Sequence, residues 1–142
     1  MKKYLALLVA VLLVVTGCGT KKLECTGNIS GLKQDVVIEY KGEDIKSLEM
    51  DMSYDKDTLE GMGITSDLLD TFISSMDAQV CPVYEAYEGV TCSTSEQNGG
   101  IRILITMDYG KLTQEAKDEL SMNYQSYDST KKDLEAAGYT CK

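Results

Sequence analysis

Five cysteines and no histidine define the chemistry open to this chain of 142 residues. The absence of histidine excludes Ser-His-Asp and Cys-His catalysis, together with zinc sites that use histidine ligands. No two cysteines form a CxxC pair, so a thioredoxin-type redox site has no support. The candidates that remain are the 23 acidic residues, closely spaced methionines and the cysteines themselves.

Cys18 directly follows the most hydrophobic run of the chain. Two lysines precede residues 4–15, an apolar stretch with the length of a signal-peptide core, too short to span a membrane. The sequence Val-Thr-Gly-Cys at residues 15–18 then resembles a bacterial lipobox, with an aliphatic residue and two small residues before the cysteine. We therefore expect residues 1–17 to be a lipoprotein signal peptide and Cys18 to carry a diacylglyceryl group.

The expected mature protein is a single domain, residues 23–142, joined to the lipid by a linker of residues 18–22. Two acyl chains such as palmitate are the minimum for stable anchoring, so the predicted location is the extracytoplasmic face of the cell membrane. Without residues 1–17 the chain keeps 12 basic and 23 acidic residues, a balance of −11. This charge argues against a nucleic-acid partner and against adhesion of the domain to anionic lipid.

The four cysteines other than Cys18 predict two disulfides, as expected for an exported protein. Cys81 and Cys92 lie at similar distances on either side of an expected helix end, so they become level if the next strand folds back along the helix. Cys25 and Cys141 then pair by elimination and join the first and last strands.

The expected elements alternate between strands and helices. Strand patterns, with period-2 alternation or β-branched residues, occur in six segments: 23–29, 35–40, 45–54, 90–95, 101–109 and 139–141. Helical spacing of apolar residues or capping signals occur in three: 65–88, 113–122 and 130–137. The order β-β-β-α-β-β-α-α-β predicts an α+β fold with helices packed on one face of an antiparallel sheet.

Several element boundaries follow from single residues. Pro82 predicts a kink or break near 78–82 in the long helix, and Gly89 is the expected stop. Thr130 is the expected cap of the last helix, and Gly138 its stop. Residues 55–63 are expected to form a turn-rich segment.

The order and lengths of these segments resemble the YehR-type family of small bacterial lipoproteins. The similarity covers nearly the whole mature chain and is carried by "YKGEDIKSLEMDMSY", "YEAYEGVTC", "IRILITMDYGKL" and the tail "STKKDLEAAGY". It implies the fold, the lipid anchor and the extracytoplasmic location, and it brings no catalytic residues. The four cysteines other than Cys18 depart from the pattern of the family.

Two groups of residues have the composition of metal ligands. Met50 and Met52 form an M-x-M pair of the kind that binds copper(I), but both fall on the apolar face of a strand, where methionine is a common packing residue. The acidic stretch from Asp51 to Glu60 fails the EF-hand pattern because leucine and glutamate occupy the fifth and sixth places counted from Asp55. We therefore expect core packing for the methionines, a solvated acidic turn, and no metal or cofactor.

Tyrosine is unusually abundant in this chain, which has one phenylalanine and no tryptophan. Tyr84, Tyr87, Tyr124 and Tyr127 lie in or near helices at spacings of three, and they could form a surface for a protein or glycan partner. The alternative, which we favour, is that these rings cover a thin core and keep their hydroxyls in water.

The sequence thus predicts a non-enzymatic lipoprotein with a binding or structural role and a membrane partner through its anchor. The alternative is an exported enzyme that uses carboxylates without histidine, since a catalytic pair requires only proximity in space.

Overall fold

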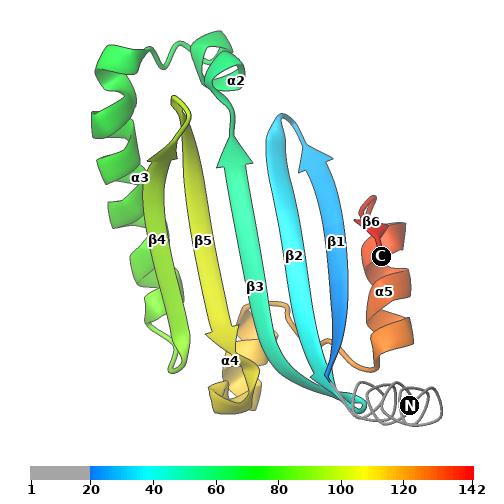
Figure 1. Ribbon diagram of the computed structural model, residues 1–142. Coiled ribbons are helices and arrows are strands. Elements are labelled where there is room, and N and C mark those ends of the chain that lie inside the picture. The colour runs from blue at the N-terminus through cyan, green and yellow to red at the C-terminus, as the bar shows by residue number, and fades with distance from the viewer. Residues whose placement is uncertain (1–19) are drawn as a thin grey trace, which may run out of the picture.

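The computed structural model describes residues 20–142, so the predicted signal peptide, residues 1–17, and Cys18 lie outside it. Its strands form one antiparallel sheet in the order β4-β5-β3-β2-β1-β6. The strands are β1 (Lys21–Ile29), β2 (Leu32–Lys41), β3 (Asp44–Tyr54), β4 (Val90–Gln97), β5 (Gly100–Asp108) and β6 (Thr140–Cys141). Figure 1 shows β1, β2 and β3 as a meander, with the β4–β5 hairpin beside β3.

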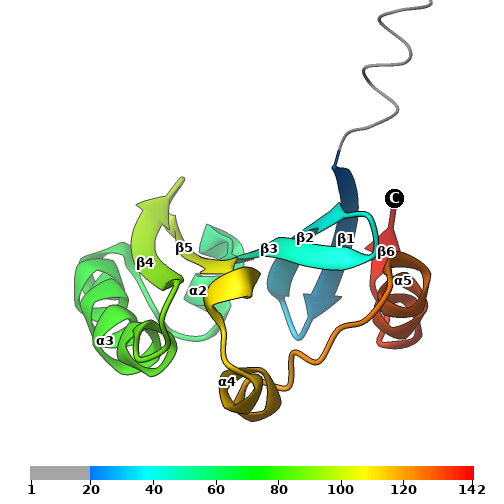
Figure 2. The same cartoon turned by 90° about the horizontal axis from the view of Figure 1, so that it is seen from below.

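The helices are α2 (Lys56–Gly61), α3 (Ser66–Glu85), α4 (Gln114–Glu119) and α5 (Tyr127–Ala136), with a 3₁₀ turn η1 (Tyr109–Lys111). Figure 2 shows α3, α4 and α5 on the same side of the sheet, and Figure 1 shows α2 at one end of the strands. The predicted α+β class is therefore confirmed. Within residues 20–142, no helix has the length and apolar composition needed to cross a membrane.

The core lies between the sheet and these helices because one face of each strand is apolar. Leu23, Ile38, Leu48 and Ile105 are at most 1% exposed, and they come from four neighbouring strands. A second, smaller cluster joins Leu59, Leu69 and Ile101 beneath α2 and the start of α3. Alternation along the strands leaves polar residues on the opposite face.

Residues 55–63 contain a short helix where the sequence predicted a turn-rich segment. Asp55 caps α2 and accepts a hydrogen bond of 2.7 Å from the Thr58 backbone N–H. Leu59 is the buried residue of this helix, at 1% exposure. A helix of six residues shows too few turns for apolar periodicity to reveal it.

The long helix is not broken near 78–82, where Pro82 predicted a kink or break. The helix α3 continues through Pro82 to Glu85, with Ala86 as its C-cap. Pro82 lies in the last turn, where its missing N–H removes a hydrogen bond near the helix end instead of in the middle. Gly89 does not end α3; it has φ +82° in the turn before β4.

The last helix begins one turn earlier than the sequence predicted. Ser126, not Thr130, caps α5, and its hydroxyl accepts a hydrogen bond from the Ser129 N–H. Thr130 lies inside the helix with 1% exposure. The sequence favoured Thr130 as the cap because Asp133 follows it at capping-box spacing. In the structure Thr130 is instead a buried residue of the helix, and the cap lies one turn earlier. Gly138, with φ +98°, follows the helix end as predicted.

Candidate functional site

Both predicted disulfides are present. Cys81 at the end of α3 is bonded to Cys92 in β4, with Cα atoms 5.2 Å apart. Cys25 in β1 is bonded to Cys141 in β6, its direct partner in the strand register. The second bond fixes the two-residue strand β6 on the outer edge of β1.

The sheet face opposite the helices is the candidate functional surface, and we call it the open face. Among residues 20–142, Figure 2 shows no helix over this side of the strands. Val37 and Leu104 are half-buried apolar residues near its centre. Polar and charged side chains surround them, among them Glu24, Thr26, Asp35, Glu49, Asp51, Ser93, Arg102 and Thr106.

Asp35 and Asp51 are the most notable pair on the open face, because they lie directly opposite one another on β2 and β3. Like charges in this arrangement are destabilising unless cations neutralise them. The Lys33 ammonium lies 3.5 Å from the Asp35 carboxylate. The Thr26 hydroxyl donates a hydrogen bond of 2.8 Å to the same carboxylate. Each aspartate therefore has its own partner, because Arg102 binds Asp51.

Arg102 reaches Asp51 from β5 with two nitrogens. Its Nε and Nη2 donate hydrogen bonds to the carboxylate, the shortest of them 2.7 Å. This bidentate geometry is the strong form of an arginine–carboxylate contact. The hydrogen bonds to Asp51 raise the pKa of the Arg102 guanidinium above its usual range.

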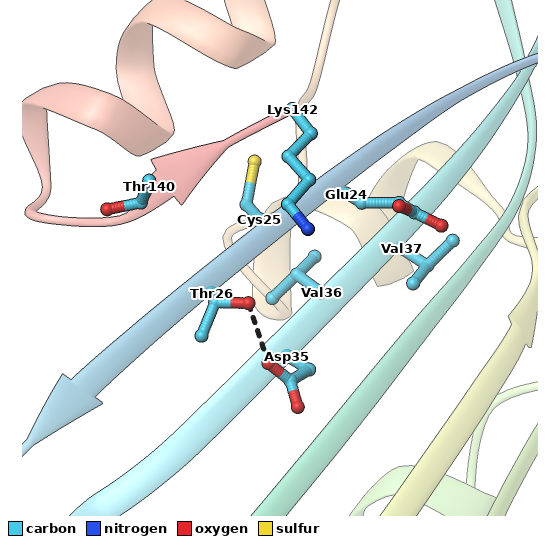
Figure 3. Close-up of a pocket in the computed structure, with 8 residues that line it drawn as sticks. All are labelled: Glu24, Cys25, Thr26, Asp35, Val36, Val37, Thr140 and Lys142. Atoms are coloured by element: carbon cyan, nitrogen blue, oxygen red, sulfur yellow. Dashed lines mark hydrogen bonds between the residues drawn. The ribbon is translucent and has the colours of Figure 1, made fainter.

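A hollow of about 200 Å³ lies on the open face beside the end of β6. Figure 3 shows Glu24, Asp35 and Thr26 around it, with the Lys142 side chain extending over β1. The Lys142 N–H donates a 2.8 Å hydrogen bond to the Glu24 carbonyl, which holds this residue beside β1. The hollow offers both carboxylates and an ammonium group, but its volume is below the roughly 300–1,000 Å³ of typical ligand pockets.

The acidic residues between Asp51 and Glu60 do not converge. Asp51 binds Arg102 on the open face, and Glu60 lies 3.6 Å from Lys56. Asp55 caps α2, and the hydrogen bonds from Thr58 lower the pKa of its carboxyl. Across residues 20–142, no group of three or more His, Cys, Asp or Glu side chains is arranged to hold a metal ion.

Met50 and Met52 are half-buried on the helix-bearing side of β3 and pack against the main core. Met50 and Met52 are therefore packing residues, as the sequence predicts.

The four tyrosines singled out in the sequence are all half-buried and pack against the main core. The Tyr87 hydroxyl donates a 2.7 Å hydrogen bond to Glu119, and the Tyr127 ring meets Tyr40 edge-on at 5.6 Å. The remaining tyrosines of residues 20–142 also pack against one of the two hydrophobic clusters. The tyrosines therefore line the core on the helix-bearing side and do not contribute to the open face.

Sequence reasoning missed the Asp35–Asp51–Arg102 group. Arg102 is 51 residues from Asp51, and only the pairing of β3 with β5 brings them together. The available signal was weak: each of the three is a charged residue at a polar position of a predicted strand.

No protein-family model matches the sequence, and no curated protein is similar to it at a significant level. The structure is similar to the NMR structure of the YehR protein of E. coli, with a TM-score of 0.71 and 14% sequence identity, over 88% of this chain and 92% of that chain. It is also similar to the NMR structure of a protein from Streptococcus pneumoniae TIGR4, with a TM-score of 0.58 and 13% identity, over 84% of each chain. The chain therefore has the fold of YehR, and the resemblance seen in the sequence is confirmed at the level of the fold.

Proposed function

We propose that this protein is a non-enzymatic lipoprotein, anchored through Cys18 at the extracytoplasmic face of the cell membrane, with a binding or structural role. Two observations support the location. The lipobox-like sequence ends at Cys18, and β1 begins at Lys21, so the domain follows the acceptor cysteine after a very short linker. The two disulfides fit an oxidising compartment.

We prefer a non-enzymatic role because the carboxylates of Asp35 and Asp51 are already bound by neighbouring side chains. Carboxylate catalysis needs a carboxyl group that is free to exchange a proton with a bound substrate. Asp51 is held by two nitrogens of Arg102, and Asp35 by Lys33 and Thr26. Both carboxylates lie on an open surface, and their charges are neutralised by Lys33 and Arg102.

The alternative, an exported carboxylate enzyme, has one feature in its favour. Glu24 and Asp35 both border the hollow of Figure 3. Under this alternative the hollow would have to bind substrate, so Glu24→Gln would abolish an activity of the purified protein. Under our proposal Glu24→Gln leaves folding and membrane attachment unchanged.

Intact mass of the membrane fraction tests the anchor. Wild-type protein should carry acyl chains on a chain that begins at Cys18, whereas Cys18→Ala should lack them and leave the membrane fraction. Thr20→Ala is the matched control, because it changes a neighbouring small residue and keeps the acceptor thiol. A wild-type mass without acyl chains would contradict the proposal.

Crosslinking on intact cells tests the binding role. The lipidated protein should form reproducible adducts through lysines near the open face, Lys33 and Lys142, that are lost when Arg102→Glu reverses a charge there. Lys132→Glu on α5 is the control for a charge reversal away from this face. Identical adducts for wild type and both variants would argue against the open face as the binding surface.

A further inference from the structure

The two edges of the sheet are protected to different degrees. At one edge β1 pairs with β6, which the Cys25–Cys141 disulfide holds in place, and the Lys142 N–H bonds to the Glu24 carbonyl. At the other edge lies β4, which within residues 20–142 pairs with β5 alone. Figure 1 shows β4 as the outermost strand, with α3 running along it. The outer edge of β4 is therefore the place where a further strand could join the sheet.

The strand register shows which backbone groups of β4 point outward. The Asp108 N–H donates a 2.9 Å hydrogen bond to the Gly89 carbonyl, and this pair directly precedes the pair of Val90 with Met107. Hydrogen-bonded and non-hydrogen-bonded pairs alternate along an antiparallel ladder. The N–H and C=O groups of every second residue of β4 therefore point away from β5, at Val90, Cys92, Thr94 and Glu96.

The second half of this outer edge is unpaired. The first outward N–H bonds to the turn before β4, and the Cys92 N–H donates a hydrogen bond of 3.4 Å to the Glu85 carboxylate. Within residues 20–142, the Thr94 and Glu96 N–H groups have no such partner. Unpaired N–H and C=O groups on an edge strand are the groups with which a strand of another chain pairs.

The strand β4 lacks the features that usually protect an edge. Lysine, proline and β-bulges on an edge strand discourage pairing with other chains. The sequence of β4, VTCSTSEQ, contains neither lysine nor proline, and its eight residues pair with β5 without a register shift. Its valine and threonine side chains suit a strand inside a sheet. The composition of β4 is therefore compatible with a strand on both sides.

A row of carboxylates on α3 follows the same edge. Asp70, Asp77 and Glu85 share one side of the helix with Cys81, because they are 11, 4 and 4 residues from it. This side faces β4, since Cys81 is bonded to Cys92 and Glu85 reaches the Cys92 N–H. Asp70 and Asp77 are exposed, and within residues 20–142 neither forms an ion pair.

The whole region around this edge is acidic. Residues 57–101, which contain α3 and β4, include eight acidic residues and no basic one. Three basic residues lie nearest to it. Lys56 lies beside the β4–β5 turn and Lys111 beside the turn before β4, whereas Arg102 is bound to Asp51 on the open face. Acidic residues remain in excess by eight to three even when all three cations are counted.

The backbone and the carboxylates together select the partner. A strand paired with β4 would lie about 4.8 Å from it and would point every second side chain toward the helix-bearing side, where Asp70 and Asp77 lie. Lysine or arginine at these alternate positions would neutralise the carboxylates of α3. A second copy of this chain would instead bring its own acidic edge against this one, and like charges across an interface are unfavourable.

We propose that the outer edge of β4 binds an extended segment of a partner protein that carries lysine or arginine at alternate positions. The segment adds a seventh strand to the sheet, pairs with the backbone of Thr94 and Glu96, and neutralises the carboxylates of α3. This interaction rests on the binding role proposed above, and it uses the edge of the sheet instead of the open face.

Amide hydrogen exchange of the full lipidated chain, held in nanodiscs of phosphatidylcholine, tests the pairing. The probe is a synthetic peptide with the length of β4 that alternates lysine and valine. It should slow the exchange of the Thr94 and Glu96 N–H groups by at least about tenfold, because each gains a hydrogen bond. The amides of β1 at the other edge of the sheet should exchange at unchanged rates.

Two further peptides separate backbone pairing from charge. A lysine–valine peptide that is N-methylated at alternate residues keeps its charge but cannot donate hydrogen bonds to β4, so it should give no protection. A peptide with glutamate in place of lysine should also give none. Salt at about 1 M, where the screening length is about 3 Å, should weaken the binding of the first peptide several-fold. Equal protection by the N-methylated peptide would overturn the pairing.

Matched variants test the role of the carboxylates. Asp70→Asn/Asp77→Asn should weaken binding of the lysine peptide by about fivefold, as expected for two exposed ion pairs, whereas Asp128→Asn/Asp133→Asn on α5 should not. Equal weakening by both variants would overturn the proposal, because only net charge would then matter. Exchange at Thr94 that slows with protein concentration, without peptide, would overturn it in favour of a second copy.

Failure of this proposal is distinguishable from failure of the binding role itself. If the lysine peptide gives no protection while crosslinks through the open face persist, the pairing at β4 is wrong and the binding role stands. If the peptide protects Thr94 and Glu96 while the open face forms no adducts, the edge of β4 is the binding surface.

Discussion

Cys25 and Cys141 lie directly opposite one another on β1 and β6, with their Cα atoms 4.0 Å apart and their sulfur atoms bonded. The strand β6 has only two residues, so few backbone hydrogen bonds hold it. Cys25 is 2% exposed within the main core. The bond therefore attaches the end of the chain, together with the preceding helix α5, to the first strand.

We predict that loss of Cys25–Cys141 destabilises the domain more than loss of Cys81–Cys92. The bonds close segments of 116 and 11 residues. The chain-entropy model assigns contributions of about 5 and about 3 kcal/mol to loops of these sizes. Urea unfolding of Cys25→Ala/Cys141→Ala and Cys81→Ala/Cys92→Ala measures the two losses, and an equal or reversed order would contradict the prediction.

Tyr40 and Tyr109 should respond in opposite ways to removal of the hydroxyl. The Tyr109 hydroxyl donates a buried 2.7 Å hydrogen bond to the Met122 carbonyl, so Tyr109→Phe should cost about 1–2 kcal/mol. The Tyr40 hydroxyl is buried without a hydrogen bond of acceptable geometry, although Thr130 lies beside it. Tyr40→Phe should therefore be neutral or stabilise by up to about 1 kcal/mol.

The two tyrosine variants are compared by the free energy of unfolding in urea at neutral pH. Each serves as the control for the other, because both remove one oxygen from a buried ring. Similar losses for the two would show that the Tyr40 hydroxyl has a partner in solution.

Gly27 is required by the close approach of Tyr139. A Cβ at Gly27 would lie 2.9 Å from the Tyr139 ring, whose hydroxyl contacts Gln34. Gly27→Ala should displace the ring and cost about 1–3 kcal/mol, as overpacking does elsewhere. Gly61→Ala is the control: a Cβ there meets nothing within 4 Å, and alanine favours the helix by about 0.5–1 kcal/mol. Thermal unfolding checks both, and a stable Gly27→Ala would mean that Tyr139 does not pack as described.

Stability should fall at alkaline pH because of buried tyrosines. Burial raises the pKa values of the Tyr40, Tyr109 and Tyr124 hydroxyls above their ordinary value. The unfolded chain then releases these protons at lower pH than the folded protein does. The associated stability is complete below about pH 10, the ordinary tyrosine pKa, and is lost as the pH rises through the raised values.

Phenolate absorbance and urea unfolding, followed together from neutral to alkaline pH, measure this effect. The three hydroxyls should ionise late, as should that of Tyr87, whose pKa is raised by its hydrogen bond to Glu119. Tyr124→Phe should reduce the loss of stability on raising the pH. Ionisation of all tyrosines at their ordinary pKa in a folded protein would contradict the assignment.

Element identity was predictable wherever a segment was long enough to show its period. The strand at residues 45–54 alternates over its whole length, and the structure differs from the prediction by one residue at its start. Cys81 and Cys92 were paired from spacing alone, because a helix followed at once by an antiparallel strand brings them level. By contrast, α2 was missed because six residues show no period, and the start of α5 was misplaced because two possible caps lie one turn apart.

The candidate site could not be predicted in the same way. Asp35, Asp51 and Arg102 come from three strands, and their contact depends on the register of β2, β3 and β5. The hydrophobic pattern determines which face a residue occupies, because side chains alternate with a period of two. It does not determine which residue of another strand lies opposite.

The sequence by itself determined the class of fold, the pairing of the cysteines and the expectation of a lipid anchor at Cys18, because each depends on local pattern or on order along the chain. Tertiary structure alone decided where the charges lie. The balance of −11 is a property of composition, whereas the contact between Asp51 and Arg102 depends on the pairing of β3 with β5. Electrostatic forces fall off within about a screening length, so position in space, not the sum of charges, determines which charged groups neutralise one another.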